Sequence, residues 1–382
     1  MFIYYLLLLF ILMNGILAKN NRRWFVYSTF TLIFLIAALR KYTIGIDLEL
    51  HYAINFERIA NLSWAEAIEY PAYDVGLNIL CKLFSYISND RQIFIICTSA
   101  IIFYSVARYI YKYAEDVAME TFMFLTMYCY FLYLNIIAQA LAFSIFLFAI
   151  PYLREKKYLK YTVIVLLAST VHASAIILVL LVPLSFLPLK RKYVALFSTL
   201  VPISLFMLDR LAIMFAEFIP EFNRYLDINN VHGRATGFSS LSLAILTVFS
   251  LILIAAWYFL FRTQKENNLY RPVLRNFGII KRRKYVDVLQ LDSNFLAYAT
   301  IIVIAARLAG TQMEVSARIG YYFYIFSFTL LGRSLLMIRS SQNRRLIKVL
   351  IYIMLGLFFL VTGHIFASKS YYGVAPYEFF WN

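Results

Sequence analysis

Long apolar stretches separated by short basic segments run along almost the whole chain. Apolar runs of about 16–22 residues recur from end to end, which is the length that a helix needs to cross the hydrocarbon core of a bilayer. The alternation of apolar and polar residues that is typical of a membrane β-barrel is absent. The pattern therefore predicts an all-α, polytopic integral membrane protein.

Clusters of Lys and Arg interrupt the apolar stretches, and the positive-inside rule assigns them to the cytoplasmic side. The clusters lie at 19–23, 108–112, 154–160, 190–192, 262–284 and 339–348. With this orientation, residues 1–382 form one transmembrane domain of about twelve spans. Its outer loops are 40–91, 209–239 and 311–318, and its inner basic loop is 262–292.

The predicted spans follow from the apolar runs between these clusters. They are 2–18, 24–39, 92–111, 119–134, 136–153, 193–208, 240–261, 293–310, 319–337 and 346–367, with a pair of short helices in 158–188. The first run has no basic residue before it, so we expect a retained helix rather than a signal peptide.

Two apolar segments are not expected to cross the membrane as single helices. Residues 158–188 lie between two basic turns, so they must form two short helices or a re-entrant hairpin, with His172 near the turn. Residues 71–87 carry Asp74, Asn78 and Lys82, which favours an interfacial or re-entrant helix.

Composition excludes several functional classes. The 382 residues are 63% hydrophobic, and the net charge of +16 is explained by the cytoplasmic loops without any nucleic-acid partner. The three cysteines, Cys81, Cys97 and Cys129, lie within apolar stretches without the spacing of metal ligands. No metal-binding motif is present, so we expect metal-independent chemistry without a cofactor.

Polar residues that are costly in hydrocarbon collect on the predicted outer side. Asn135 and Gln139 are four residues apart and would share one face of the 136–153 helix, either as interhelical amide contacts or as part of a site. His172 is either structural or functional. Arg40 ends the 24–39 span and can project into a cavity; it is followed by Asp47, Glu49, His51 and Tyr52.

A further polar stripe is predicted near residue 310. If the segment is helical, Arg307, Thr311, Glu314 and Arg318 share one face, since their spacings are 4, 3 and 4. They would form a plain ion pair or grip a phosphate, which arginine does bidentately. The outer loop 209–239 adds Arg210, Arg224, His232 and Arg234.

The outer side therefore combines groups that suit a lipid-linked sugar. Arginines suit a pyrophosphate, aromatic faces suit sugar rings, and a histidine or carboxylate can deprotonate an acceptor hydroxyl. An apolar groove between helices suits a polyprenyl tail.

The order of these elements resembles the EpsG-like, Wzy-type polymerases of bacterial exopolysaccharide and capsule. A helix is followed by R-x(4)-G-x-D-x(4)-Y, a Tyr-Pro element, N-x-x-x-Q-x-L-A, a basic turn and a helix that ends in H-x-S-A. The resemblance covers most of residues 1–190 and, more loosely, the stretch around Arg318 and the tail.

The resemblance implies a GT-C-like, inverting membrane glycosyltransferase. It would polymerise oligosaccharide repeat units carried on undecaprenyl pyrophosphate, at the outer face of the bacterial cytoplasmic membrane. Its partners would be the lipid-linked donor and acceptor, membrane lipids, and a flippase and chain-length regulator. The matching positions are Arg40, Gly45, Asp47, Tyr52, Asn135, Gln139, His172 and Arg318. His172 or Asp47 would act as the base, and Arg40 would hold the pyrophosphate.

One position departs from the family pattern. An arginine is expected directly before the glutamine, where this chain has Ala138. Either Arg40, Arg307 or Arg318 takes over its role, or the chain is an inactivated variant that captures substrate. We favour the second hypothesis.

Three other functions remain open at this point. An O-antigen-ligase-like transferase would use the same donor but tends to have a larger outer loop. A transporter or flippase for the lipid-linked unit would have inverted repeats and polar residues in both membrane halves. The inner halves here carry little besides Arg333, which disfavours transport. The last alternative is a scaffold subunit of a synthase complex.

Overall fold

The computed structural model of the chain is helical throughout the residues that it describes. These are 1–18, 21–186, 240–270, 293–311, 314–369 and 371–381, with isolated positions from 196 to 207. The only strand-like pairing among them is a single bridge between Arg40 and Phe379. The predicted all-α fold is confirmed. The predicted outer loop 209–239 and residues 271–292 of the inner loop lie outside the described residues.

The chain divides into two compact units. The first unit comprises residues 1–182 and 349–382, and the second comprises residues 183–348. The prediction of one transmembrane domain is not tested by this division.

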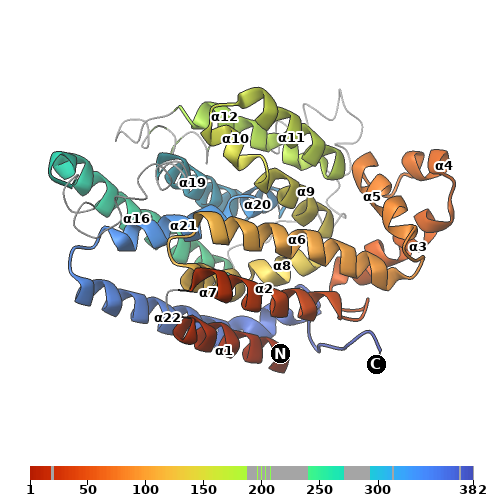
Figure 1. Ribbon diagram of the computed structural model, residues 1–382, viewed down its shortest axis with the longest axis horizontal. Coiled ribbons are helices and arrows are strands. Elements are labelled where there is room, and N and C mark those ends of the chain that lie inside the picture. Colours follow the sequence, from red (N-terminus) through yellow and green to blue (C-terminus); the bar gives the residue numbers. More distant parts are fainter. Residues whose placement is uncertain are drawn as a thin grey trace. The chain divides into compact units, whose positions relative to one another are not determined.

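The first unit contains the helices of residues 1–180, which are labelled in chain order in Figure 1. They are α1 (Phe2–Leu17), α2 (Arg22–Ala38), η1 (Leu48–Tyr52), α3 (Ala53–Asn61), α4 (Trp64–Glu69), α5 (Val75–Ser85), α6 (Arg91–Tyr113), α7 (Val117–Thr126), α8 (Cys129–Asn135), α9 (Ile137–Leu147), α10 (Ile150–Arg154), α11 (Tyr158–Val171) and η2 (Ala173–Leu180). The helix α2 packs along α6, α9 packs against both α6 and α11, and α11 packs against α5. The helices α3, α4 and α5 form a cluster of short helices after the α2 end (Figure 1).

The second unit packs three of its helices against one another. Its helices are α16 (Ser240–Tyr270), α19 (Ser293–Ala309), α20 (Glu314–Tyr321) and α21 (Tyr324–Leu336). The helices α16, α19 and α21 contact each other, and α20 packs on α19. Two elements pass from one unit to the other, α12 (Leu181–Leu184) and α22 (Ser341–Ala367).

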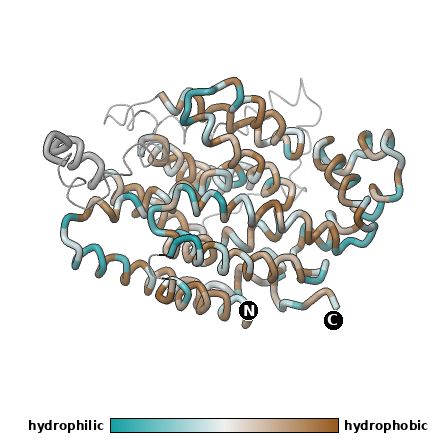
Figure 2. Tube along the Cα trace, viewed as in Figure 1, coloured by the Kyte–Doolittle hydropathy of each residue, from teal (hydrophilic) through white to brown (hydrophobic). Residues whose placement is uncertain are grey.

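Two of the described helices, α6 and α22, are long and apolar enough to cross a membrane. A third span is formed if α7 and α8, which are bent by 57°, are taken together. Helix α22 is mostly apolar along its length (Figure 2) and exposes side chains such as Leu357 and Val361. These candidate spans indicate a membrane protein. The other apolar helices are shorter, so the expected number of about twelve spans stays a prediction.

The predicted spans 119–134 and 136–153 are wrong as continuous helices. The first bends between α7 and α8, where Tyr128 adopts a left-handed conformation with φ 62°. The second ends early because Pro151, which has no N–H to donate, lies in the first turn of the separate helix α10. Between the two predicted spans, the chain breaks again at Ile136, with ψ 59°.

The two segments that were not expected to cross the membrane as single helices contain only short helices in the structure. Residues 158–188 contain α11 and the 3-10 helix η2, separated by the extended residue His172, as predicted. Helix α5 has 11 residues, which at about 1.5 Å per residue cannot cross a core of about 30 Å.

The predicted stripe near residue 310 is not one helix face. Helix α19 ends at Ala309, and Glu314 begins the separate helix α20. The two helices pack closely, because a Cβ on Gly310 would stand only 2.6 Å from the Cβ of Ala317. Arg307 therefore lies on α19, whereas Glu314 and Arg318 lie on α20.

The contact of α5 with α11 depends on Gly76. A Cβ on this residue would stand 2.7 Å from the backbone carbonyl of Thr170, so Gly76→Ala must push the helices apart. We expect a loss of about 1–3 kcal/mol of stability, measured as a lower Tm of the purified protein in detergent. The control is Gly356→Ala, where the added Cβ would meet Phe122 at an ordinary 3.7 Å. Equal melting of the two variants would contradict this account.

Candidate functional site

The loop after α2 supplies hydrogen-bond partners to the break between α8 and α9. The N–H of Asp47 donates to Oδ1 of Asn135 at 2.9 Å, and the N–H of Ala138 donates to the hydroxyl of Tyr52 at 3.2 Å. Backbone groups beside a helix end lack partners within the helix. These bonds therefore fix the end of α8 and the first turn of α9 against the loop.

Gly45 and Arg40 approach the same break from the carbonyl side. Gly45 has φ +111°, a conformation that favours glycine, and a Cβ on it would stand 3.0 Å from the carbonyl oxygen of Leu134. Nη2 of Arg40 donates to this oxygen at 3.1 Å. All four loop positions of R-x(4)-G-x-D-x(4)-Y thus meet the residues from Leu134 to Ala138.

Arg40 lies in a closed surrounding rather than in an open cavity. Its side chain is 1% exposed, and its Nε and Nη1 have no hydrogen-bond partner in the described part of the chain. Burial lowers the pKa of Arg40 to about 10, while the hydroxyls of Tyr130, Tyr4 and Tyr377 oppose this shift. The guanidinium stays charged at neutral pH. It is therefore a buried cation, surrounded by tyrosines, with one bond to the helix break.

The C-terminal tail covers Arg40. The N–H of Lys41 donates to the carbonyl of Glu378 at 3.0 Å, and the N–H of Phe380 donates to the carbonyl of Leu39 at 3.0 Å. Lys41 and Glu378 also form an ion pair at 2.9 Å. These bonds flank the bridge between Arg40 and Phe379 and fix the loop from its outer side.

A second set of tail contacts holds the turn at Gly45. The N–H of Gly45 donates to the carbonyl of Gly373 at 2.9 Å, and the N–H of Ile46 donates to that of Tyr372 at 3.2 Å. Loop and tail are more than 300 positions apart in sequence but pair along most of their length.

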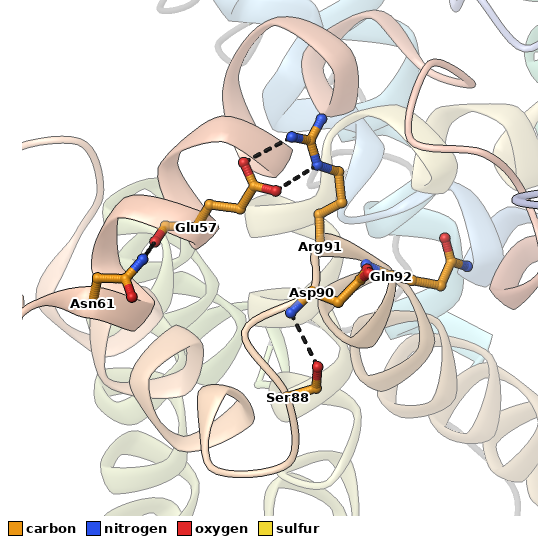
Figure 3. A network of polar contacts seen from close by, with 6 residues as sticks. All are labelled: Glu57, Asn61, Ser88, Asp90, Arg91 and Gln92. Atoms are coloured by element: carbon orange, nitrogen blue, oxygen red, sulfur yellow. Dashed lines mark hydrogen bonds and ion pairs between the residues drawn. The ribbon is translucent and has the colours of Figure 1, made fainter.

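The start of α6 contacts the loop, and its Arg91 also pairs with Glu57 of α3 (Figure 3). Arg91 forms a bidentate ion pair with Glu57 at 2.7 and 2.8 Å, and its guanidinium lies 4.2 Å from the ring of Tyr42. Nε2 of Gln92 donates to the carbonyls of Ala38 at 2.6 Å and Arg40 at 3.3 Å. The α2 end is therefore fixed by side chains from α6.

A second polar group lies at the break between α11 and η2. Oδ2 of Asp74 accepts a hydrogen bond from the N–H of Ala173 at 2.8 Å and lies 3.8 Å from Nδ1 of His172. Both side chains are partly exposed, at 30% for His172 and 40% for Asp74. The Asp74 carboxylate therefore lies close enough to the imidazole to orient its ring.

Aromatic residues connect the two groups. Tyr73 stacks on Tyr52 with 5.5 Å between ring centroids and meets His51 edge-on at 5.1 Å. Its hydroxyl donates to the carbonyls of His51 at 3.2 Å and Tyr52 at 3.3 Å. The hydroxyl of Tyr52 accepts a hydrogen bond from Ala138 at the start of α9, and the ring of Tyr52 stacks on Tyr73. Tyr73 is joined by a peptide bond to Asp74, which lies beside His172. The two polar groups are therefore connected through these residues.

The structure changes how Asn135 and Gln139 come together. Asn135 ends α8 and Gln139 lies in α9, so the prediction that they share a face of one helix is wrong. The break at Ile136 separates them because the chain leaves the helical conformation there. Both side chains are nevertheless buried beside the same break.

Sequence reasoning missed Asp74 and Tyr73 as site residues. In the sequence, Asp74 indicated only that residues 71–87 do not cross the membrane as a single helix. The available signal was the Tyr-Pro element at 70–71, which Tyr73 and Asp74 follow after one alanine. Arg307, Glu314 and Arg318 belong to the second unit, and their part in the site stays a prediction. Among the described residues, no three His, Cys, Asp or Glu side chains are grouped as metal ligands.

Comparison with known proteins decides the family. A model of the EpsG family matches residues 23–379. The chain belongs to the EpsG family. The matched range includes both the loop after α2 and the tail that pairs with it. Membership confirms the predicted resemblance and suggests a role in exopolysaccharide biosynthesis. No curated protein and no solved structure matches this EpsG-family chain, so the GT-C-like fold stays a prediction.

The tail should control access to Arg40. In a chain that ends at Ser368, we expect phenylglyoxal to modify Arg40 readily, because the strand-like partner and Tyr377 are gone. In the full chain Arg40 should stay unmodified while the exposed Arg23 reacts. Peptide mass spectrometry after timed labelling measures both.

Arg91 is the internal control for a folded loop, because its bidentate bond to Glu57 does not involve the tail. Equal protection of Arg40 in both chains would show that the tail is not its cover.

Proposed function

We propose that this protein is a membrane glycosyltransferase that joins polyprenyl-pyrophosphate-linked oligosaccharide repeat units into exopolysaccharide or capsule. The reaction takes place at the outer face of the membrane, is independent of metal and inverts the anomeric centre. The observation that carries the proposal is the meeting of the Arg40–Tyr52 loop with the start of α9, next to Asp74 and His172. Membership of the EpsG family supports the substrate class.

The start of α9 is the part of the site that suits the pyrophosphate. The first N–H groups of a helix and its dipole favour an anion. Ala138 and Gln139 lie in this first turn; the N–H of Ala138 donates to the hydroxyl of Tyr52, which lies against the same turn. As the bond to the sugar breaks, negative charge develops on the leaving pyrophosphate, and fixed donors in a water-poor site stabilise this charge most.

His172 is the base that the arrangement favours. The acceptor is the hydroxyl at the non-reducing end of the incoming unit. Its oxygen attacks the anomeric carbon of the growing chain from the side opposite to the pyrophosphate. The hydroxyl proton passes to His172, and polyprenyl pyrophosphate leaves with the electron pair of the broken bond. Asp74 lies 3.8 Å from Nδ1 of His172 and stabilises the imidazolium that forms.

Asp47 is the other base considered. Its backbone N–H is used to hold Asn135, which makes it part of the loop that supports the α8–α9 break. Tyr73 is partly exposed and stacks on the buried ring of Tyr52, so its own ring suits the sugar.

The next question is which residue supplies the positive charge that binds the pyrophosphate. Arg40 is enclosed by the tail and bonded to Leu134, so it supports the site from behind in this conformation. An arginine at position 138 would stand in the first turn of α9, beside the loop. We therefore keep the hypothesis that Ala138 makes the chain an inactivated variant that captures substrate.

Restoring the cation tests this hypothesis. We expect Ala138→Arg to raise polymer formation from lipid-linked repeat units in proteoliposomes, by up to about 10²–10³-fold, the effect of one charge-stabilising donor. Polymer length on gels and the rate of donor use are the measurements. Ala138→Leu adds comparable bulk without charge and should give no gain. An unchanged rate in Ala138→Arg would disprove the hypothesis.

The base is tested in the Ala138→Arg background. His172→Ala should lower the rate by about 10²–10⁴-fold, as expected for loss of a general base. Asp74→Asn should lower it less, because the neutral amide no longer stabilises the imidazolium that forms in the reaction but leaves His172 itself in place.

Ser169→Ala, a neutral change on the same helix end, is the control and should leave the rate unchanged. Full polymer formation by His172→Ala would remove His172 from this role.

A further inference from the structure

A groove of about 480 Å³ runs between α2 and α6, away from the site described above. The two helices pack side by side (Figure 1), and Phe30, Phe34 and Phe103 form much of its apolar wall. The lining positions on α2 run from Val26 to Phe34, which is a length of roughly 12 Å at 1.5 Å per residue. The groove therefore fits a single extended hydrocarbon chain.

One end of the groove is polar and basic. Tyr27, Arg108 and Tyr111 line it there. This end is where α2 begins and α6 finishes, since Nε of Arg22 donates to the carbonyl of Tyr111 at 2.6 Å. The opposite end is lined by Phe34 and by Ala100. The groove thus has the polarity of an amphiphile, with a cation at one end only.

Two cations at this end, Arg108 and Lys112, lie against aromatic rings. Arg108 lies 4.5 Å from the ring of Phe148, and Lys112, one turn further along α6, lies 5.3 Å from the ring of Tyr113. In the part of the chain that the structure describes, neither forms an ion pair with a carboxylate. Glu155, the acidic residue of the neighbouring turn, is paired with Lys157 at 2.7 Å. Two like charges one turn apart repel, and an anion between them would relieve this repulsion.

We propose that this groove binds one anionic phospholipid, with an acyl chain along the phenylalanines and the phosphate between Arg108 and Lys112. The cluster 108–112 is one that the positive-inside rule assigns to the cytoplasmic side, where anionic headgroups attract basic residues. The polyprenyl donor is the weaker candidate occupant, because its pyrophosphate is used at the outer face. Only this ranking of the two occupants rests on the proposed glycosyltransferase activity.

Native mass spectrometry of the full chain in detergent tests this, with phosphatidylglycerol and phosphatidylcholine as probes. One Lys or Arg contributes about 1 kcal/mol to attraction of anionic lipid, which corresponds to about fivefold in binding. We expect a preference of tenfold or more for phosphatidylglycerol, with about fivefold lost in Arg108→Gln and nearly all in Arg108→Gln/Lys112→Gln. Lys160→Gln removes a basic charge away from the groove and should keep the preference.

The groove itself is tested by Ala107→Phe, which fills it, against Ile101→Phe, a change on the same helix outside the lining. The first should lower binding of both probes at this site, and the second should not. An unchanged preference in Arg108→Gln/Lys112→Gln, wild-type binding by Ala107→Phe, or a groove that retains a polyprenyl lipid in place of phosphatidylglycerol would each overturn the proposal.

Discussion

The break in the chain at Ile136 is the feature on which the first unit depends. A helix that stops and restarts leaves N–H and C=O groups without helical partners, and in a membrane protein water is scarce as a substitute. The loop after α2 provides partners for two of these backbone groups through Arg40 and Tyr52, and the N–H of Asp47 holds the side chain of Asn135. The close approach requires glycine at position 45, where a side chain would meet the Leu134 carbonyl. The sequence motif is thus a set of partners for one helix break.

The buried charge of Arg40 follows from the same arrangement. A guanidinium that reaches the Leu134 carbonyl lies under the loop, and burying a charge without a carboxylate is costly. Tyrosine hydroxyls and the paired tail enclose it, which places residues from both ends of the chain around one cation. The loop is thereby held by the tail on one side and by Gln92 on the other. Such a loop can present Tyr52 to the start of α9 in a fixed position.

The two breaks of the first unit have different surroundings. The break at Ile136 is buried, with its polar groups bonded to the loop, whereas His172 and Asp74 at the second break are partly exposed. Buried donors suit stabilisation of charge, and a partly exposed imidazole suits exchange of a proton. Stacked Tyr52 and Tyr73 connect the two breaks, so the binding part and the proton-transfer part of the proposed reaction would be joined by packed rings.

The sequence by itself determined the helical class, the family and the hairpin at His172, because hydrophobic run lengths and basic turns act locally along the chain. It also indicated the loop residues. Their roles, and the partners Asp74 and the tail, were decided only by tertiary structure. Hydrogen bonds that join residue 45 to residue 373, or Asp74 to Ala173, leave no periodicity to read. A helix break such as the one at Ile136 cannot be predicted from the sequence either, because the residues on both sides of it are apolar. The hydrogen bonds that the helix loses there are replaced by groups that are distant in sequence.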